Sequence, residues 1–243
     1  MARITTTDRV FASLRESIVT GEFPAGSLHS IYRLADLLEV SRTPVREAVL
    51  RLADIGLVTI ERNRGVRIRG VTVADVRAVF ELRLMIEVPA AAFAAARADA
   101  AQVDAIRSEL EHMRRSAADD EEQRFTTHDR LLHQAVGAPM DNARLQAEVA
   151  TLRDSIQARG ATTIRRSRGM DELATEHAPI VEAIAAGDPA TAAAAMERHL
   201  VNTATLLMEQ VAGPDDVDPE WSRALRDHLY VPGRAAGAEH EHQ

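Results

Sequence analysis

The stretch Ser41–Leu52, SRTPVREAVLRL, decides the fold of the first part of the chain. It predicts a helix that Ser41 caps and that has Pro44 in its first turn, where a missing backbone N–H costs little. Arg42 and Arg46 lie four residues apart and share one face of this helix. Apolar residues at helical spacing make another face: Val45, Ala48, Val49, Leu52 and Ile55. Two exposed arginines near a helix start suit a DNA recognition helix, and they equally suit a solvated surface helix.

The neighbouring segments favour DNA recognition. Apolar periodicity predicts helices over Val10–Thr20 and Ser30–Glu39, and a tight turn then leads into the stretch above. Two short helices joined by a tight turn, the second rich in exposed arginine, make a helix-turn-helix. After Gly56 the apolar period changes from 3.6 to 2, over residues 58–61 and 66–69, which predicts a β-hairpin.

This hairpin is expected to act as a wing beside the helix-turn-helix. Its tip carries Arg62 and Arg64, and its second strand is expected to point Arg67 and Arg69 outward. A hairpin of this kind can also be a structural lid on the helices. The basic residues at its tip favour a contact with the DNA backbone or minor groove.

Charge is distributed unevenly along the chain. The whole chain has a net charge of −8, yet residues 1–70 contain eleven arginines against eight acidic residues. The remaining residues contain eighteen arginines against twenty-nine acidic residues. All 29 basic residues are arginine, so an arginine alone is weak evidence of function. The asymmetry fits a weakly basic DNA-facing module attached to an acidic body.

Composition excludes several classes of protein. The chain has no cysteine, so it has neither disulfides nor a thiolate site. No apolar run approaches the roughly 20 residues that cross a bilayer, and the N-terminus lacks the apolar core of a signal peptide. We therefore expect a cytoplasmic protein that does not bind membranes.

The rest of the chain reads as helices without strands. They are expected over residues 72–98, 99–118, 121–136, 141–158, 171–186 and 189–211, and glycines or Asp188-Pro189 separate several of them. Six helices over about 140 residues imply an antiparallel bundle. The expected fold is thus mainly α: an N-terminal winged helix-turn-helix over 1–70, an all-α antiparallel bundle over 71–212, and a partly disordered tail over 213–243.

Four side chains of the bundle are candidate metal ligands. Asp129 and His133 lie four apart on one helix face, while His177 and His199 lie on two later helices. Three imidazoles and a carboxylate from three helices can converge on one divalent cation. A histidine on a helix is more commonly an ordinary surface or core residue, and spacing alone does not decide between the two. We interpret four other histidines as ordinary residues: His128, His228, His240 and His242.

Arg83 also shares a stripe with apolar residues. It lies four residues before Glu87, so the two can form a helix salt bridge worth a few tenths of a kcal/mol. The alternative is an inward guanidinium whose fork binds a ligand carboxylate. Asn202, one turn after His199, can line the same pocket.

Residues 10–69 resemble the winged helix-turn-helix of the GntR superfamily of bacterial transcription regulators. The resemblance rests on PAGSL (Pro24–Leu28), RLADLLEVSRTPVREAVLRL (Arg33–Leu52), GLV (Gly56–Val58) and RGVRI (Arg64–Ile68). It implies that the matching residues contact DNA: Arg42, Thr43, Arg46 and the wing tip at Arg62, Asn63, Arg64 and Gly65. Many members carry an arginine one position before Arg33, where this chain has Tyr32, which leaves Arg33 as the candidate replacement.

The bundle resembles the FCD domain of the FadR-type branch of that family. The metal-binding pattern of that branch is matched by Asp129…His133, by Glu176–Asp188 (EHAPIVEAIAAGD) and by His199-Leu200. This resemblance implies a metal held by Asp129, His133, His177 and His199. The matching E-L-R-x-x-x-E motif, Glu81–Glu87, implies that Arg83 binds an effector carboxylate.

These features together predict a ligand-responsive transcription regulator, in the first place a repressor, that reads a palindromic operator in double-stranded DNA as a homodimer. Its cofactor would be a divalent metal, with zinc expected first and nickel, manganese or iron as alternatives. The effector would be a small carboxylate. Two alternatives stay open: a metal-dependent enzyme built on the bundle, and a regulator that senses the metal itself. No separate general base or nucleophile motif accompanies the ligands, so no catalytic residue is assigned.

Overall fold

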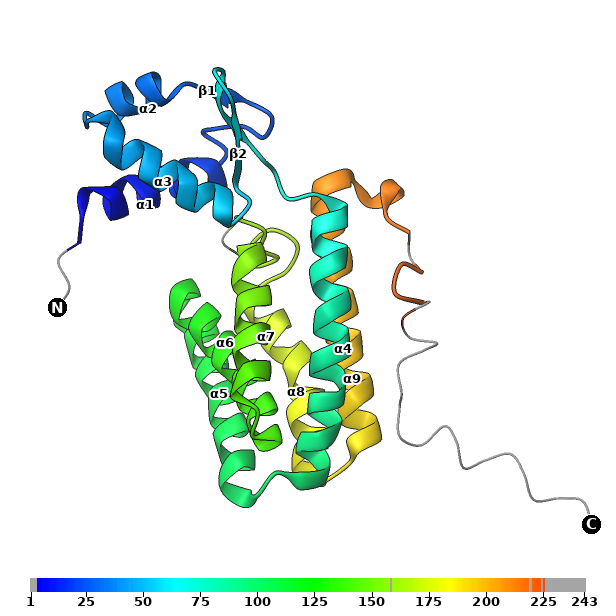
Figure 1. Ribbon diagram of the computed structural model, residues 1–243. Coiled ribbons are helices and arrows are strands. Elements are labelled where there is room, and N and C mark those ends of the chain that lie inside the picture. Colours follow the sequence, from blue (N-terminus) through cyan, green and yellow to red (C-terminus); the bar gives the residue numbers. More distant parts are fainter. Residues whose placement is uncertain (1–3, 158, 219, 224, 226–243) are drawn as a thin grey trace, which may run out of the picture. The chain divides into compact units, whose positions relative to one another are not determined.

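The computed structural model describes residues 4–157, 159–218, 220–223 and 225. The chain divides into two compact units (Figure 1). The first comprises residues 1–72 together with 154–162, and the second comprises residues 73–153 and 163–243. Each unit has its own buried core, and the two are described separately below.

Three helices form most of the first unit: α1 (Thr6–Val19), α2 (Ile31–Leu37) and α3 (Arg42–Asp54). The apolar face predicted for α3 is buried, because Val45 and Ala48 are fully inaccessible and Leu52 is 1% exposed. It packs against apolar side chains of α1, α2 and the following strands. The two helices α2 and α3 are therefore held as a helix-turn-helix by a common aliphatic core.

A small antiparallel sheet completes this unit. Strands β2 (Val58–Glu61) and β3 (Gly65–Ile68) form the predicted hairpin, with Val58 opposite Ile68. A two-residue strand β1 (Leu28–His29) adds to the other side of β3, so the strand order is β1-β3-β2. Gly65 is required here: it has φ of +125°, and a Cβ at this position would lie 2.3 Å from the His29 carbonyl oxygen.

Several local predictions need correction. The first helix begins at Thr6 rather than at Val10, because Thr5 and Asp8 form a capping box that starts it earlier. Ser41 occupies the N-cap position of α3, but its side chain makes no capping hydrogen bond. Strand β1 was not predicted, since two residues are too few to show an alternating pattern.

The second unit is an all-helical bundle, as predicted. Its long helices are α4 (Val73–Arg97), α5 (Ala100–Ala118), α6 (Glu122–Gly137), α7 (Ala143–Gln157), α8 (Met170–Ala186) and α9 (Pro189–Ala212). Two short 3₁₀ turns, η1 (Ala138–Met140) and η2 (Pro214–Asp216), follow α6 and α9. The last residues of α7, from Asp154 on, group with the first unit.

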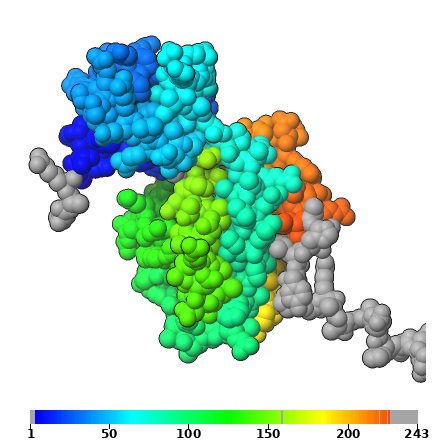
Figure 2. Space-filling view, in the orientation of Figure 1, coloured from blue at the N-terminus to red at the C-terminus, as the bar shows by residue number. Residues whose placement is uncertain are grey.

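Packing in the bundle runs through two main pairs of helices. Helix α4 lies along α9, and α5 lies along α6, with α8 in contact with both α5 and α9 (Figure 1). Helices α4, α6 and α7 make up most of the bundle face that Figure 2 presents. The interior is aliphatic and alanine-rich, which allows the helices to approach closely.

The region after α9 is only partly described. Trp221 is buried, and its indole N–H donates to Thr205 Oγ1 over 3.1 Å. Most of the tail over 213–243, which was predicted to be partly disordered, lies outside the described residues, as do His228, His240 and His242. Among the helices that are described, none is both long and apolar enough to cross a membrane.

Candidate nucleic-acid interface and metal centre

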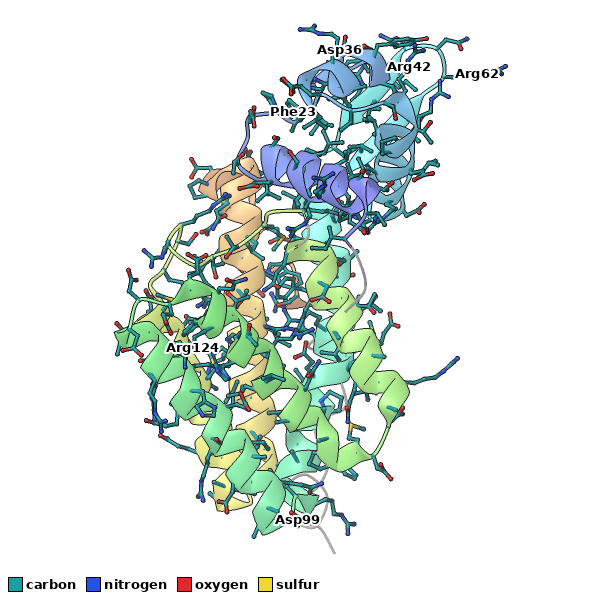
Figure 3. All side chains as sticks on the ribbon, turned by 90° about the vertical axis from the view of Figure 1, so that its left-hand side faces the viewer. Phe23, Asp36, Arg42, Arg62, Asp99 and Arg124 are labelled. Carbon is teal, nitrogen blue, oxygen red and sulfur yellow. The ribbon has the colours of Figure 1, made fainter. Side chains whose placement is uncertain are left out.

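The residues predicted to contact DNA lie on the surface of the first unit. Arg33, Arg42 and Arg46 are exposed, as are Thr43 and the tip of the wing at residues 62–64. Arg42, at the start of α3, and Arg62, at the wing tip, lie at the same end of this unit (Figure 3). Recognition helix and wing therefore present basic side chains on a common side, which suits contact with a groove and its flanking phosphates.

Two of the basic side chains of the wing are paired within the first unit, which the sequence did not predict. Arg67 was expected to point outward, but it forms an ion pair with Glu61, and its Nη1 donates to the Gly26 carbonyl over 2.6 Å. Arg64 lies 3.1 Å from the same carboxylate. Glu61 therefore neutralises part of the charge of the wing, and Arg62 remains the more available cation of the two at the tip.

Tyr32 has an unexpected role next to the recognition helix. The guanidinium carbon of Arg42 lies 4.4 Å from the centroid of the Tyr32 ring. This is a cation–π contact between α2 and α3. The residue that departs from the family pattern thus supports an arginine that is itself expected to contact DNA.

Three histidines meet inside the second unit. His133 from α6, His177 from α8 and His199 from α9 are all buried, and one nitrogen of each lies within 4.8 Å of the others. The Nε2 atoms of His133 and His177 are 3.3 Å apart. Asp129 of α6 joins them, since its Oδ1 lies 3.2 Å from His177 Nε2. The structure thus brings together the four side chains that were predicted as metal ligands.

The hydrogen bonds of these rings orient free electron pairs toward one another. His177 Nδ1 donates to the Leu173 carbonyl over 2.8 Å, so the Nε2 of the neutral ring carries a lone pair. His133 Nδ1 donates to the Glu87 carboxylate, which leaves a lone pair on its Nε2 as well. Two lone pairs and a carboxylate oxygen therefore converge within about 3.3 Å, which is unfavourable without a shared proton or a cation.

Burial keeps these groups in the states that metal binding requires. Burial, followed by the nearby charge of Arg153, lowers the pKa of His133 to about 4. Burial also holds the pKa of His199 well below its usual value. Burial alone would raise the pKa of the Asp129 carboxyl, but the charge of Arg153 outweighs it, so that pKa is lowered. Neutral imidazoles beside an ionised carboxylate are ligand-competent groups.

Two buried arginines lie beside the histidine centre. Arg83, at 5% exposure, pairs through Nε with Glu87 Oε1 over 2.6 Å, so the predicted i,i+4 salt bridge exists but is buried. Arg153, on α7, pairs with Asp129. Arg83 Nη2 and Arg153 Nε are buried and have no hydrogen-bond partner among the described residues. Both guanidiniums therefore retain an unused N–H donor.

Arg153 was not predicted, although a signal for it exists. It follows Val149 by four residues and precedes Ile156 by three, so it lies in the apolar stripe of α7, as Arg83 does on α4. Burial lowers the pKa of the Arg83 guanidinium because it disfavours the charged form. The nearby charge of Arg153 lowers this pKa further, whereas the Glu87 carboxylate raises it without reversing the shift. The charge of Arg153 is therefore close enough to Arg83 to disfavour the protonated form of that guanidinium.

A second ion pair reaches the centre through His199. Its Nδ1 lies 3.4 Å from Glu176 Oε2 but makes no hydrogen bond. Glu176 is in turn paired with the buried Arg168, whose Nη2 donates to Thr203 Oγ1 over 2.7 Å. Arg168 lies between α7 and α8, where no periodic pattern predicts burial. Asn202, the second predicted effector residue, is exposed and donates to Glu176 Oε1 over 2.8 Å.

The spacing of these atoms fits a divalent cation. In a tetrahedral zinc site with bonds of about 2.0–2.1 Å, neighbouring ligand atoms lie about 3.3–3.4 Å apart. The separations of 3.3 Å between the two Nε2 atoms and 3.2 Å between Nε2 and Asp129 Oδ1 come close to this value. The bonds from His133 Nδ1 to Glu87 and from His177 Nδ1 to Leu173 also match the outer contacts that usually orient metal-bound imidazoles.

The fold and the exposed basic surface define a class of protein. A winged helix-turn-helix with basic residues on its recognition helix and wing, joined in one chain to a helical bundle, is a DNA-binding transcription regulator. Comparison with known proteins identifies the family. Residues 6–68 match the family model of "Bacterial regulatory proteins, gntR family", and residues 78–202 match the FCD domain. The chain therefore belongs to the GntR family, with an FCD domain as its second part.

Similar proteins are regulators and not enzymes. The "HTH-type transcriptional regulator LutR" of Bacillus subtilis is 27% identical over 209 residues, covering 78% of this chain and 95% of LutR. A "Probable D-xylose utilization operon transcriptional repressor" of Paenarthrobacter nicotinovorans is 28% identical, covering 82% and 88%. The crystal structure of a putative GntR regulator from Rhodococcus sp. RHA1 is 26% identical with a TM-score of 0.59, covering 83% of this chain and 97% of that one.

Proposed function

We propose that this protein is a ligand-responsive transcription repressor of the FadR-type branch, with a divalent metal and a small carboxylate effector in its bundle. Its membership of the GntR family carries the DNA-binding part of the proposal. The description of one relative as an operon repressor supports the direction of control. A recognition helix reads only a few base pairs, so a homodimer on a palindromic operator is the expected assembly. Such a regulator would act in the cytoplasm.

The converging lone pairs of the histidine centre carry the metal part of the proposal. His133 Nε2 and His177 Nε2 face each other at 3.3 Å, and in each ring the other nitrogen, Nδ1, donates a hydrogen bond elsewhere. A cation bound by His133, His177, His199 and Asp129 would relieve this arrangement. Imidazole-rich sites with one carboxylate favour zinc, with nickel, manganese or iron as alternatives.

Charge balance supports a carboxylate as the effector. The ion-pair network around the histidine centre contains three buried arginines (Arg83, Arg153, Arg168) and three carboxylates (Glu87, Asp129 and the partly exposed Glu176). These charges cancel, so a bound divalent ion would add two positive charges to a site of low dielectric constant. An anion would offset them, and it could accept hydrogen bonds from the unused donors Arg83 Nη2 and Arg153 Nε.

The effector would control DNA binding by preferring one conformation of the dimer. A ligand can shift such an equilibrium only by as much as its affinities for the two states differ. By linkage, operator DNA must then weaken effector binding by the same factor by which the effector weakens DNA binding. Measuring both factors therefore tests the mechanism without knowledge of the conformations.

The metal part is tested by the metal content of purified protein after dialysis. The wild type should retain an ion in the histidine centre, and His177→Ala should lose it. His29→Ala, in the first unit, is the matched control and should retain the ion. Full retention in His177→Ala would show that the ligand set is wrong.

The effector part is tested by a thermal-shift screen of small carboxylic acids on the metal-loaded protein, followed by operator release. A true effector should raise the melting temperature and weaken operator binding. Arg83→Gln should reduce both effects. Operator release by a chelator alone, without any acid, would instead identify a metal sensor, and consumption of an acid at catalytic rates would identify an enzyme.

A further inference from the structure

We propose that Glu109, His112 and His128 form a second metal site, between α5 and α6, which is separate from the histidine centre inside the bundle. Glu109 and His112 lie three residues apart and share one face of α5. His128 lies on α6, which packs along α5 (Figure 1). From the sequence, His128 was interpreted as an ordinary residue. His112 lies sixteen positions earlier on another helix, so helical spacing does not relate the two.

The three side chains already lie close to one another. His128 Nδ1 lies 2.8 Å from Glu109 Oε2, and the rings of His112 and His128 have centroids 4.6 Å apart. One ligand atom from each of the three residues lies within 4.8 Å of the others. Neighbouring ligands of a tetrahedral ion are about 3.3–3.4 Å apart, so side-chain shifts of about 1 Å or less would close the site.

A hydrogen bond between His128 and Glu109 does not account for the whole cluster. His112 Nδ1 is buried and has no hydrogen-bond partner among the described residues. An unsatisfied buried polar atom costs free energy, and a hydrogen-bonding partner or a metal ion would remove that cost. Coordination through Nδ1 would therefore give His112 the partner that it lacks.

The donor set indicates the class of ion. Two imidazoles and one carboxylate suit zinc and its neighbours cobalt and nickel, whereas calcium and magnesium prefer oxygen ligands only. The side chains of Glu109 and His128 are 21% and 19% exposed, so water can complete the coordination. The ion at this site should therefore exchange readily, unlike one enclosed in the buried histidine centre, and it would link α5 to α6.

The experiment uses the full chain and counts zinc ions by equilibrium titration. The wild type should bind one more zinc ion per chain than His112→Gln, and His29→Gln should match the wild type. In the presence of a weak chelator, zinc should leave this site first. A second readout is cobalt: its absorption in the visible range should lose one of two components in His112→Gln.

The same substitution is also tested in a His177→Ala chain, where zinc-dependent stabilisation shows that the protein is folded. This test separates the second site from the histidine centre of the proposed function. In His177→Ala, where the histidine centre lacks a ligand, zinc should still raise the melting temperature. Adding His112→Gln should weaken that zinc binding at least about 10-fold, because removing a direct ligand costs no less than removing an outer contact. Equal zinc stoichiometry and affinity with and without His112→Gln would overturn the second site, whatever the histidine centre does. If His177→Ala alone abolished all zinc binding, the histidine centre would account for every bound ion, and the second site would also be overturned.

Discussion

The recognition helix and the histidine centre use arginine in opposite ways. On α3, Arg42 and Arg46 are exposed, and their charge is available to an outside partner. In the bundle, Arg83 and Arg153 are buried, and each is paired with a carboxylate. A surface arginine therefore signals binding by its charge. A buried arginine signals it only through the donors that its ion pair leaves unused.

The largest expected effect concerns the buried pairs. Glu87→Ala leaves the Arg83 charge buried without its partner and removes the acceptor of His133, so the free energy of unfolding should fall by about 3–5 kcal/mol. Arg77 and Glu81 form an ion pair with the same i,i+4 spacing on the same helix, but their side chains are 50% and 32% exposed. Glu81→Ala should cost only about 0.3–0.5 kcal/mol, because solvent screens that pair. Urea unfolding of the two variants measures both, and equal losses would contradict the distinction.

Acid should expose the same burial in the metal-free protein. The His133 pKa is about 4 in the folded chain and near 6.5 when unfolded, so the unfolded chain takes up the proton first. The free energy of unfolding should therefore fall as the pH drops from about 6.5 to about 4, by on the order of 3 kcal/mol for this residue. His199, whose pKa is also lowered, adds to the loss. Below that range the depressed pKa values of Asp129 and Glu87 continue it.

The measurement is urea unfolding of chelator-treated protein across this pH range. His133→Gln should reduce the slope between pH 6.5 and 4, because the substituted side chain does not titrate. An equal slope in the variant and the wild type would show that His133 is not buried in its neutral form.

Periodicity predicted the elements of both regions, because burial repeats along a helix or strand. The apolar faces of α3 and the hairpin followed from spacing alone, and so did the shared face of Asp129 and His133 on α6. Residues outside such patterns were missed. Strand β1 is too short to have a period, and Arg168 lies between helices, so its burial depends on Thr203 and Glu176 of other elements.

Contacts between elements were the least predictable. The sequence places Arg67 on the outward face of β3, but its partner Glu61 lies on the neighbouring strand, and only the register of the hairpin brings them together. His112 and His128 meet for a similar reason, through the packing of α5 on α6. Resemblance to a family supplied the histidine centre but gave no information on such pairs.

The exposed arginines should affect DNA binding rather than stability. Arg46→Ala should weaken operator binding by about 1–3 kcal/mol. If Arg46 contacts a base edge, the variant should also discriminate less between operator and other sequences. If Arg46 contacts a phosphate, binding should weaken by the same amount on every sequence. Arg51, on the same helix, pairs with Asp8 and serves as the control. Arg51→Ala should leave operator affinity unchanged. Titration of both variants with specific and non-specific DNA measures the effect, and unchanged affinity in Arg46→Ala would remove its assigned role.

The smallest expected effect tests whether an exposed arginine also needs to be positioned. The Tyr32 ring lies 4.4 Å from the Arg42 guanidinium, and a cation–π contact at an exposed site is worth about 0.5–1 kcal/mol. Tyr32→Ala should weaken operator binding by up to that amount. Without the ring, Arg42 is not ordered in the free protein, so the entropy cost of ordering it is added to the binding step. Tyr32→Phe keeps the ring and should keep the affinity, unless the hydroxyl itself reaches the DNA. In Arg42→Ala, the further change Tyr32→Ala should have no added effect. An added loss in that double variant would mean that Tyr32 contacts DNA directly and does not act through Arg42.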